Sequence, residues 1–230
     1  MKHDRSYTDQ RSLWEGYYSA QSWLGPDAAS PFVAIANEAF ASAGATTILD
    51  LGCGIGYGAI YLAERGLTVF ALDFSHGGLV LLHDACRTRW PSVGAGCAQT
   101  PIHCLQADIA QTLPFQACAF GAVYAHLSLH YFDDTTTRAV FAEIRRVLFP
   151  GGALAFCCKS IDDPFYGQGV QIGPDIFERN GHRRHYFSID YARSLLRDWQ
   201  IEQLVAQKGV YGQIDRQSAF IWAIARKPIS

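Results

Sequence analysis

A glycine-rich turn at residues 48–58, Ile-Leu-Asp-Leu-Gly-Cys-Gly-Ile-Gly-Tyr-Gly, joins an apolar stretch to a helix-like one. Glycine lets the backbone approach a ligand closely and adopt positive φ angles that side chains disfavour. A helix that follows such a turn presents free N–H groups at its first residues. The pattern predicts a loop that holds either the pyrophosphate of a dinucleotide or the amino-acid part of S-adenosylmethionine.

The spacing of the glycines leaves both readings open. Counted from Gly54, the loop fits the Gly-x-Gly-x-x-Ala pattern of nicotinamide dinucleotide enzymes, and Asp73 follows at the distance of about 20 residues that a ribose-binding acid has there. Asp50 favours the second reading. A carboxylate just before the first glycine has no use beside a pyrophosphate, whereas it suits a ligand with a cationic amine.

Five motifs, in order along the chain, resemble those of class I S-adenosylmethionine-dependent methyltransferases. They lie at residues 48–56, 71–75, 107–109 with 113–115, 120–124 and 143–152. The fourth has Gly121 where the family usually has Asp. The resemblance implies that Asp73 binds the ribose hydroxyls, that Asp108 meets the adenine amino group, and that Ile109 packs on the adenine ring; Phe74 is either an adenine platform or a core residue. The implied cofactor site consists of Asp50, Gly52, Cys53, Gly54, Gly56, Asp73, Phe74, Asp108, Ile109 and Ala125.

Two histidines, His126 and His130, follow the fourth predicted strand. In open α/β sheets, ligands bind beyond the carboxyl ends of the strands, where the strand order reverses. Imidazoles at that position can orient a nucleophile or take its proton, and they can equally serve as hydrogen-bonded packing residues. We take His126 and His130 as the candidate catalytic residues.

Residues 160–187 show no clear period and are rich in Gly, Pro, Asp and aromatic residues. A stretch of this length without regular structure is unusual in a compact domain and is often functional. Near its end, two arginines stand between histidines and aromatics, which suits an oxyanion; the alternative is a solvated charge run before the next helix. We predict a substrate-side insertion whose acceptor-binding residues are Arg183, Arg184, His185 and Tyr186.

Residues 1–43 are predicted to form an N-terminal helical lid. Trp14, Tyr17 and Tyr18 cluster before a break at Gly25-Pro26, and Ser30-Pro31 begins a second helix. The aromatic cluster could close over the cofactor, with Tyr18 at the acceptor. An ordinary amphipathic helix gives the same pattern.

Short apolar strands alternate with amphipathic helices through most of the chain. The predicted strands are 46–51, 67–72, 102–106, 119–125, 153–158, 201–210 and 218–226, and the helices between them are 57–65, 75–89, 135–148 and 188–199. Pro150-Gly151-Gly152 is predicted to stop the third of these helices. This rhythm predicts one α/β domain over residues 1–230: a Rossmann-like, doubly wound, seven-stranded sheet, mostly parallel with an antiparallel C-terminal strand pair and with helices on both faces.

Composition limits the remaining classes. Of 230 residues, 49% are hydrophobic and 17% charged, which excludes a disordered chain, and the net charge of −2 offers no broad nucleic-acid or membrane surface. There is neither a signal-peptide pattern nor an apolar run of about 20 residues, so we expect a cytoplasmic monomer or homodimer. The seven cysteines lack metal-ligand spacing, so we expect buried, reduced thiols and no metal site.

Together these features predict a methyltransferase that uses S-adenosyl-L-methionine to methylate a small, anionic acceptor on oxygen. Methylation of a metalloid oxyanion of the tellurite type, an NAD(P)-dependent oxidoreductase that uses the same loop, and a cofactor-binding module without activity are the alternatives. A nucleic-acid substrate is disfavoured, because residues 125–128 lack the Asn/Asp-Pro-Pro-Tyr signature of enzymes that methylate amino groups in nucleic acids.

Overall fold

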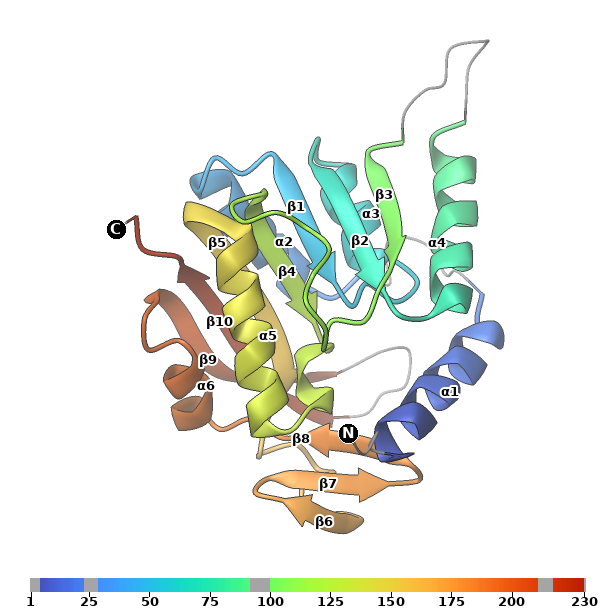
Figure 1. Cartoon of the computed structure of the whole chain (residues 1–230), viewed down its shortest axis with the longest axis vertical. Coiled ribbons are helices and arrows are strands. Elements are labelled where there is room, and N and C mark those ends of the chain that lie inside the picture. Colours follow the sequence, from blue (N-terminus) through green and yellow to red (C-terminus); the bar gives the residue numbers. More distant parts are fainter. Residues whose placement is uncertain (1–4, 23–28, 92–99, 211–216, 230) are drawn as a thin grey trace.

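The computed structural model describes residues 5–22, 29–91, 100–210 and 217–229. A seven-stranded sheet lies at its centre, with the strand order β3-β2-β1-β4-β5-β10-β9 (Figure 1). β10 pairs antiparallel with both β5 and β9, whereas the other neighbouring strands are parallel. The predicted fold class is confirmed. The strands are β1 (Thr47–Leu51), β2 (Thr68–Asp73), β3 (Ile102–Gln106), β4 (Phe120–His126), β5 (Leu148–Lys159), β9 (Gln200–Val210) and β10 (Gln217–Arg226).

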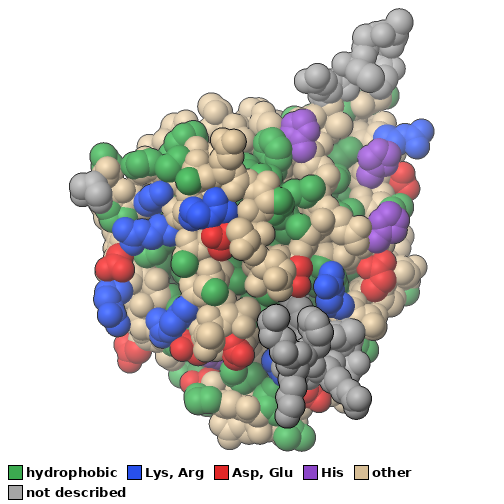
Figure 2. Space-filling view, viewed as in Figure 1, with side chains coloured by type: hydrophobic (Ala, Val, Ile, Leu, Met, Phe, Trp, Pro, Cys, Tyr) green, Lys and Arg blue, Asp and Glu red, His purple; other side chains and the backbone are tan. Residues whose placement is uncertain are grey.

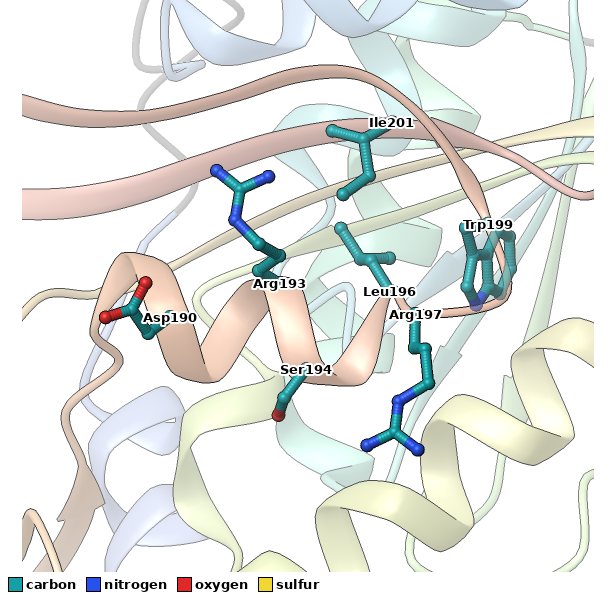
Figure 3. A pocket seen from close by; sticks show the side chains of 7 residues that line it. All are labelled: Asp190, Arg193, Ser194, Leu196, Arg197, Trp199 and Ile201. Carbon is teal, nitrogen blue, oxygen red and sulfur yellow. The ribbon is translucent and has the colours of Figure 1, made fainter.

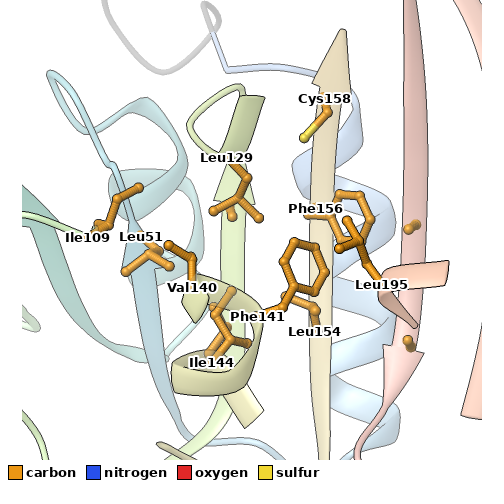
Figure 4. Packing of buried hydrophobic residues seen from close by; sticks show 14 of the residues in the cluster. Leu51, Ile109, Leu129, Val140, Phe141, Ile144, Leu154, Phe156, Cys158 and Leu195 are labelled. Atoms are coloured by element: carbon orange, nitrogen blue, oxygen red, sulfur yellow. The ribbon is translucent and has the colours of Figure 1, made fainter. Parts of the chain in front are cut away.

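Helices cover both faces of this sheet. On one face, Val140, Phe141 and Ile144 of α5 (Asp134–Val147) pack with Leu51 and Phe156, and α6 (Ile189–Leu195) adds Leu195 (Figure 4). The opposite face is covered by α2 (Phe32–Ser42), α3 (Tyr57–Ala63) and α4 (His76–Arg89). Side chains alternate between the faces of a strand, so each central strand contributes to both cores. None of the described helices is long and apolar enough to cross a membrane.

Side-chain caps fix where three helices begin. The side-chain oxygens of Ser75, Asp133 and Ser188 accept hydrogen bonds from the N–H groups of Gly78, Thr136 and Tyr191, which begins α4, α5 and α6 respectively. Such a cap satisfies one of the free N–H groups of the first turn. The start of α4 matters most for the site, because it follows directly after Asp73.

Residues 160–187 are not irregular, and this part of the prediction is wrong. They contain a three-stranded antiparallel sheet of β6 (Val170–Gly173), β7 (Ile176–Arg179) and β8 (His182–His185). β7 and β8 are joined by Asn180-Gly181, both with positive φ, and Arg179 pairs with His182. Asn-Gly between two strands is the strongest short-range hairpin signal in a sequence, so residues 180–181 by themselves predict this turn.

β5 begins earlier than expected. The helix α5 ends at Val147 and β5 starts at Leu148, so Pro150-Gly151-Gly152 lies inside the strand rather than in a helix stop. Phe120 pairs with Leu148 and Ala122 with Ala153, so residues 149–152 bulge outward between two paired positions. Gly151 adopts φ +78°, which a bulge of this kind requires. The bulge re-registers β5 against β4 before both strands reach the crevice.

The predicted N-terminal region divides into two helices with different places. α2 packs into the sheet's core through Phe32 and Phe40. The helix α1 (Arg5–Ser19) instead lies across the carboxyl edge of the sheet, where it contacts α4 and β8 (Figure 1). The predicted break at Gly25-Pro26, and the connection that begins at Tyr211, lie outside the described residues.

Candidate functional site

The glycine-rich turn lies where the strand order reverses, between β1 and β4. Gly52, Gly54 and Gly56 all have positive φ, and α3 begins directly after them. A Cβ atom at Gly52 would lie 2.4 Å from the Cβ of Ser128, and one at Gly54 would lie 2.7 Å from the Oη of Tyr18. Neither position therefore accommodates a side chain, so the backbone of the turn carries none there, and Ser128 and Tyr18 lie directly over it.

Asp73 ties this turn to the end of β2. One carboxylate oxygen accepts the N–H of Gly54 at 2.8 Å, and the other accepts the N–H of Ser75 at 2.9 Å. The side chain is buried, and burial raises its pKa above the ordinary value despite these bonds. Asp73 thus fixes the two backbone segments that would flank the ribose of a bound nucleoside.

Asp50 is a buried carboxylate without a cationic side chain beside it among the described residues. It is 2% exposed, and burial, reinforced by the charge of Asp73, raises its pKa to about 8. A positively charged ligand amine next to Asp50 would reverse this shift, because an opposite charge favours the ionised form. S-adenosylmethionine carries such an amine, so the residues present fit this cofactor.

The remaining predicted cofactor residues differ in how they face the crevice. Asp108 accepts the N–H of Ala110 at 2.9 Å at the end of β3, and Phe74 lies beside it under α1. Cys53 is half-buried in the turn. Ile109 and Ala125 are buried in the α5-side core, so their side chains already have packing partners there.

The helix α1 supplies residues that sequence reasoning missed. Arg11 pairs with Asp108 at 3.7 Å and lies 5.4 Å from the centre of the Phe74 ring. Glu15 accepts hydrogen bonds from the Ser75 hydroxyl at 2.6 Å and from the N–H of Gly77 at 2.8 Å. A carboxylate at the start of α4 is favoured by the free N–H groups there. The i, i+4 spacing of these two residues was the available signal.

Tyr18 lies on the same face of α1, over Gly54 rather than at the predicted acceptor side. Its ring also approaches Gly78 at the start of α4. Trp14 stacks on Tyr18 and contacts Tyr131 and His182 with ring centres 5.5 and 5.4 Å away. The helix α1 therefore contacts the glycine-rich turn through Tyr18 and both Tyr131 and His182 through Trp14.

The two predicted histidines lie at the carboxyl end of β4. His126 is its last residue, and burial lowers its pKa to about 4, so its imidazole is neutral at physiological pH. His130 is 1% exposed, its pKa is well below the ordinary value because of burial, and its Nδ1 has no hydrogen-bond partner. Ser128 between them donates to the carbonyl of Leu51 at 2.5 Å and has a structural role.

The predicted acceptor-binding residues 183–186 lie on β8 or directly after it. Their side chains point to two different faces of the strand. Successive side chains point to opposite faces, which divides Arg184 and Tyr186 from Arg183 and His185. Arg184 is within hydrogen-bonding reach of the phenol groups of Tyr131 and Tyr186. His185 packs against Phe187 instead, with ring centres 5.1 Å apart.

A buried ion pair adjoins this region and had no sequence signal. Lys159, the last residue of β5, donates to Asp163 at 2.8 Å and also to Ser218. Asp163 further accepts the N–H groups of Phe165 and Ala219. These bonds hold the start of the small sheet against β5 and β10. Lys159 and Asp163 are four residues apart in the sequence, but their contacts with Ser218 and Ala219 join distant segments, and the spacing of residues does not predict those contacts.

Other features of the surface do not add to the site. On the face shown in Figure 2, Lys and Arg side chains are interspersed with Asp and Glu. An open depression beside α6 (Figure 3) contains none of the predicted site residues and is lined by Asp190, Arg193, Ser194, Leu196, Arg197, Trp199 and Ile201. Among the described residues, no three His, Cys, Asp or Glu side chains gather as metal ligands would. Burial raises the pKa of the Cys86 thiol to about 11, so that thiol stays protonated.

Comparison with known proteins gives one family match and several relatives. Residues 49–156 match the model of a methyltransferase domain. A malonyl-[acyl-carrier protein] O-methyltransferase of Salmonella typhimurium is 36% identical over 110 residues, 48% of this chain and 38% of that protein. An uncharacterised methyltransferase of Synechocystis sp. is 31% identical over 108 residues, 47% of this chain and 44% of that protein. The matched segments thus span less than half of each of these relatives.

Among solved structures, a methyltransferase resembles this chain along almost its whole length. The Burkholderia thailandensis 1,6-didemethyltoxoflavin-N1-methyltransferase, solved with 1,6-didemethyltoxoflavin and S-adenosylhomocysteine, has a TM-score of 0.73 at 19% identity. The match covers 99% of this chain and 92% of that one. At this identity the likeness concerns the fold, which includes the antiparallel C-terminal strands.

Proposed function

The chain carries a class I S-adenosylmethionine-dependent methyltransferase domain, and on this premise we propose that it methylates a small, anionic acceptor on oxygen. S-adenosylmethionine is the cofactor of this domain, so the nicotinamide alternative falls away. One observation supports the proposal that the acceptor is anionic. The Arg184 guanidinium lies beside two phenols, and no described carboxylate pairs with it.

In this proposal the cofactor lies along the carboxyl ends of β1, β2 and β3. Asp50 and the bare turn at Gly52 and Gly54 receive its amino-acid part, Asp73 the ribose and Asp108 the adenine. The buried carboxylate of Asp50 and the bare glycine backbone support this orientation. The cofactor supplies an electrophilic methyl group on a sulfonium, so the protein has to align the acceptor and exclude water.

The proposed acceptor side includes two cations, Lys159 and Arg184, which differ in their partners. Lys159 is already paired with Asp163, whereas the hydrogen-bond partners of Arg184 among the described residues are the phenols of Tyr131 and Tyr186 and include no carboxylate. A buried guanidinium without a counter-charge is costly, and an anionic ligand offsets that cost. The methylation of oxygen is further supported by the relatives that are malonyl-[acyl-carrier protein] O-methyltransferases.

In this proposal His126 is the residue that holds a proton during the reaction. Its neutral imidazole, at the end of β4, can accept a proton from a hydroxyl acceptor, while an acceptor that is already an oxyanion needs no base. His130, deeper and without an Nδ1 partner, orients the acceptor.

The helix α1 acts as the lid in this proposal, and the small sheet of β6, β7 and β8 as the substrate-side insertion. Arg11, Glu15 and Tyr18 each contact a different part of the proposed cofactor site. A lid of this kind excludes water from the reacting atoms.

The experiment that tests the proposal is an acceptor screen that measures formation of S-adenosylhomocysteine. We expect turnover with small carboxylic acids or hydroxy acids and none with their amides. Tellurite forms a separate arm for metalloid methylation, and NADH in a binding assay is the negative control. Tight binding of S-adenosylhomocysteine without turnover on any acceptor would favour a binding module instead.

A further inference from the structure

Arg184 lies at a junction of three elements around the acceptor side. It projects from β8 toward Tyr131, which belongs to the short helical turn Leu129–Tyr131 after β4, and toward Tyr186 at the end of β8. Trp14 of α1 lies against the other side of Tyr131. Two elements besides β8 therefore hold the groups around this guanidinium in place.

The hydrogen-bond directions at this junction leave a set of donors without an acceptor. A guanidinium has only donors, so the oxygens of Tyr131 and Tyr186 accept from Arg184. Each phenol then keeps its own O–H for another acceptor, and burial raises the pKa of both phenols, so these protons stay in place. The Nε of Arg184 is buried without a partner as well.

A second buried side chain near Arg184, that of His130, also has a polar atom without a hydrogen-bond partner. His130 is 1% exposed, and its Nδ1 lacks a hydrogen-bond partner. Arg184 is the charged group that contributes most to lowering the pKa of His130. Its ring lies 4.5 Å from that of Tyr131. Buried polar groups are normally paired, so several unpaired groups around one cation indicate a ligand that supplies acceptors.

Building on the proposed function, we infer that Arg184, Tyr131 and Tyr186 bind a carboxylate of the acceptor as an anchor, and that the methyl group goes to a different atom. A planar carboxylate takes two parallel N–H bonds from an arginine and has lone pairs left for two phenols. Oxygens that accept so many hydrogen bonds are poor nucleophiles. The acceptor class is therefore a carboxylic acid with a second nucleophilic oxygen, which would face His126.

The anchor is tested first by binding, without turnover. Benzoate and its neutral analogue benzamide are titrated into the full chain saturated with S-adenosylhomocysteine, by calorimetry. We expect benzoate to bind and benzamide to bind at least about tenfold more weakly, since the amide offers one acceptor and no charge. Equal binding of the two, or tighter binding of inorganic phosphate than of benzoate, would overturn the carboxylate assignment.

Variants that remove single donors test which groups bind the carboxylate. Tyr131→Phe and Tyr186→Phe keep the rings and remove only a hydroxyl, and each should weaken benzoate about five- to tenfold. Arg184→Lys keeps the charge without the planar fork and should weaken it more. Tyr166→Phe is the matched control, because its ring also contacts that of Tyr186, with ring centres 5.6 Å apart, whereas its hydroxyl donates to Asp175 at 2.6 Å. Phenylalanine variants that bind benzoate like the wild type would refute the site.

The identity of the methylated product separates the anchor from the proposed function. With an accepted hydroxy acid, the anchor requires a product that keeps its free carboxylate and resists alkaline hydrolysis. An alkali-labile methyl ester would overturn the anchor while leaving the methyltransferase proposal intact. The reverse pattern, benzoate binding that depends on both tyrosines but no turnover with any acid, would support the anion site and count against the proposed activity.

Discussion

Replacing Asp73 by asparagine removes one charge from the most constrained part of the proposed cofactor site. Its two carboxylate oxygens accept the N–H groups of Gly54 and Ser75 at 2.8 and 2.9 Å. An asparagine amide can accept only one of these, and its NH2 group then faces the other N–H. One charge-assisted bond becomes neutral, and the second is lost with a buried donor left unpaired.

The two losses set the expected magnitude. Weakening one bond costs about 1 kcal/mol and leaving a buried N–H unpaired costs about 1–3 kcal/mol, so the free energy of unfolding should fall by roughly 2–4 kcal/mol. In the bound state, loss of charge-assisted bonds to the ribose hydroxyls should cost about 2–3 kcal/mol, which weakens S-adenosylhomocysteine by roughly 30- to 150-fold.

Calorimetric titration with S-adenosylhomocysteine, together with urea unfolding, measures both quantities on the same protein. Asp84→Asn is the matched control, since that carboxylate lies on α4 with a side chain that is 64% exposed, and it should change neither quantity appreciably. A folded Asp73→Asn protein that binds S-adenosylhomocysteine within about threefold of the wild type would refute the reasoning.

Three further predictions follow from contacts in and beside the crevice. Gly54→Ala should weaken cofactor binding strongly because its Cβ meets the Tyr18 hydroxyl, and adding Tyr18→Phe should restore part of the affinity in calorimetry, although the strain of φ +55° stays. The pKa of Asp50 is about 8 in the free protein, so the free energy of unfolding should decrease as pH rises from about 4 to 8. Cofactor binding should release a proton below pH 8, because the ligand amine favours ionised Asp50. Calorimetric titrations in buffers of different ionisation enthalpy measure this proton release, which Asp50→Asn should abolish. Lys159→Met leaves Asp163 buried without its cation and should lower the free energy of unfolding by about 3–5 kcal/mol. Adding Asp163→Asn in the same chain should restore most of this loss. If the effects of the two substitutions simply add in the double variant, the paired role is contradicted.

Local patterns in the sequence determined the sheet, its helices and the glycine-rich turn. Apolar strands with period two and amphipathic helices are signals contained within a few residues, and so are the glycines at 52, 54 and 56, whose positive φ angles the structure shows. The match with the methyltransferase domain then confirms the resemblance drawn from the five motifs. The Asn180-Gly181 hairpin was also in the sequence, and its omission led to the wrong description of residues 160–187.

What only the tertiary structure decided is which distant residues meet. Glu15 reaches Ser75 and Gly77 because α1 crosses the carboxyl edge of the sheet, and Tyr18 lies over the glycine turn for the same reason. Arg183 and Arg184 look alike in the sequence, yet a strand sends neighbouring side chains to opposite faces, and it is Arg184 whose guanidinium reaches the phenols of Tyr131 and Tyr186. Burial, which makes Asp50 hard to ionise and His126 neutral, is likewise a property of the packed whole and not of any short segment.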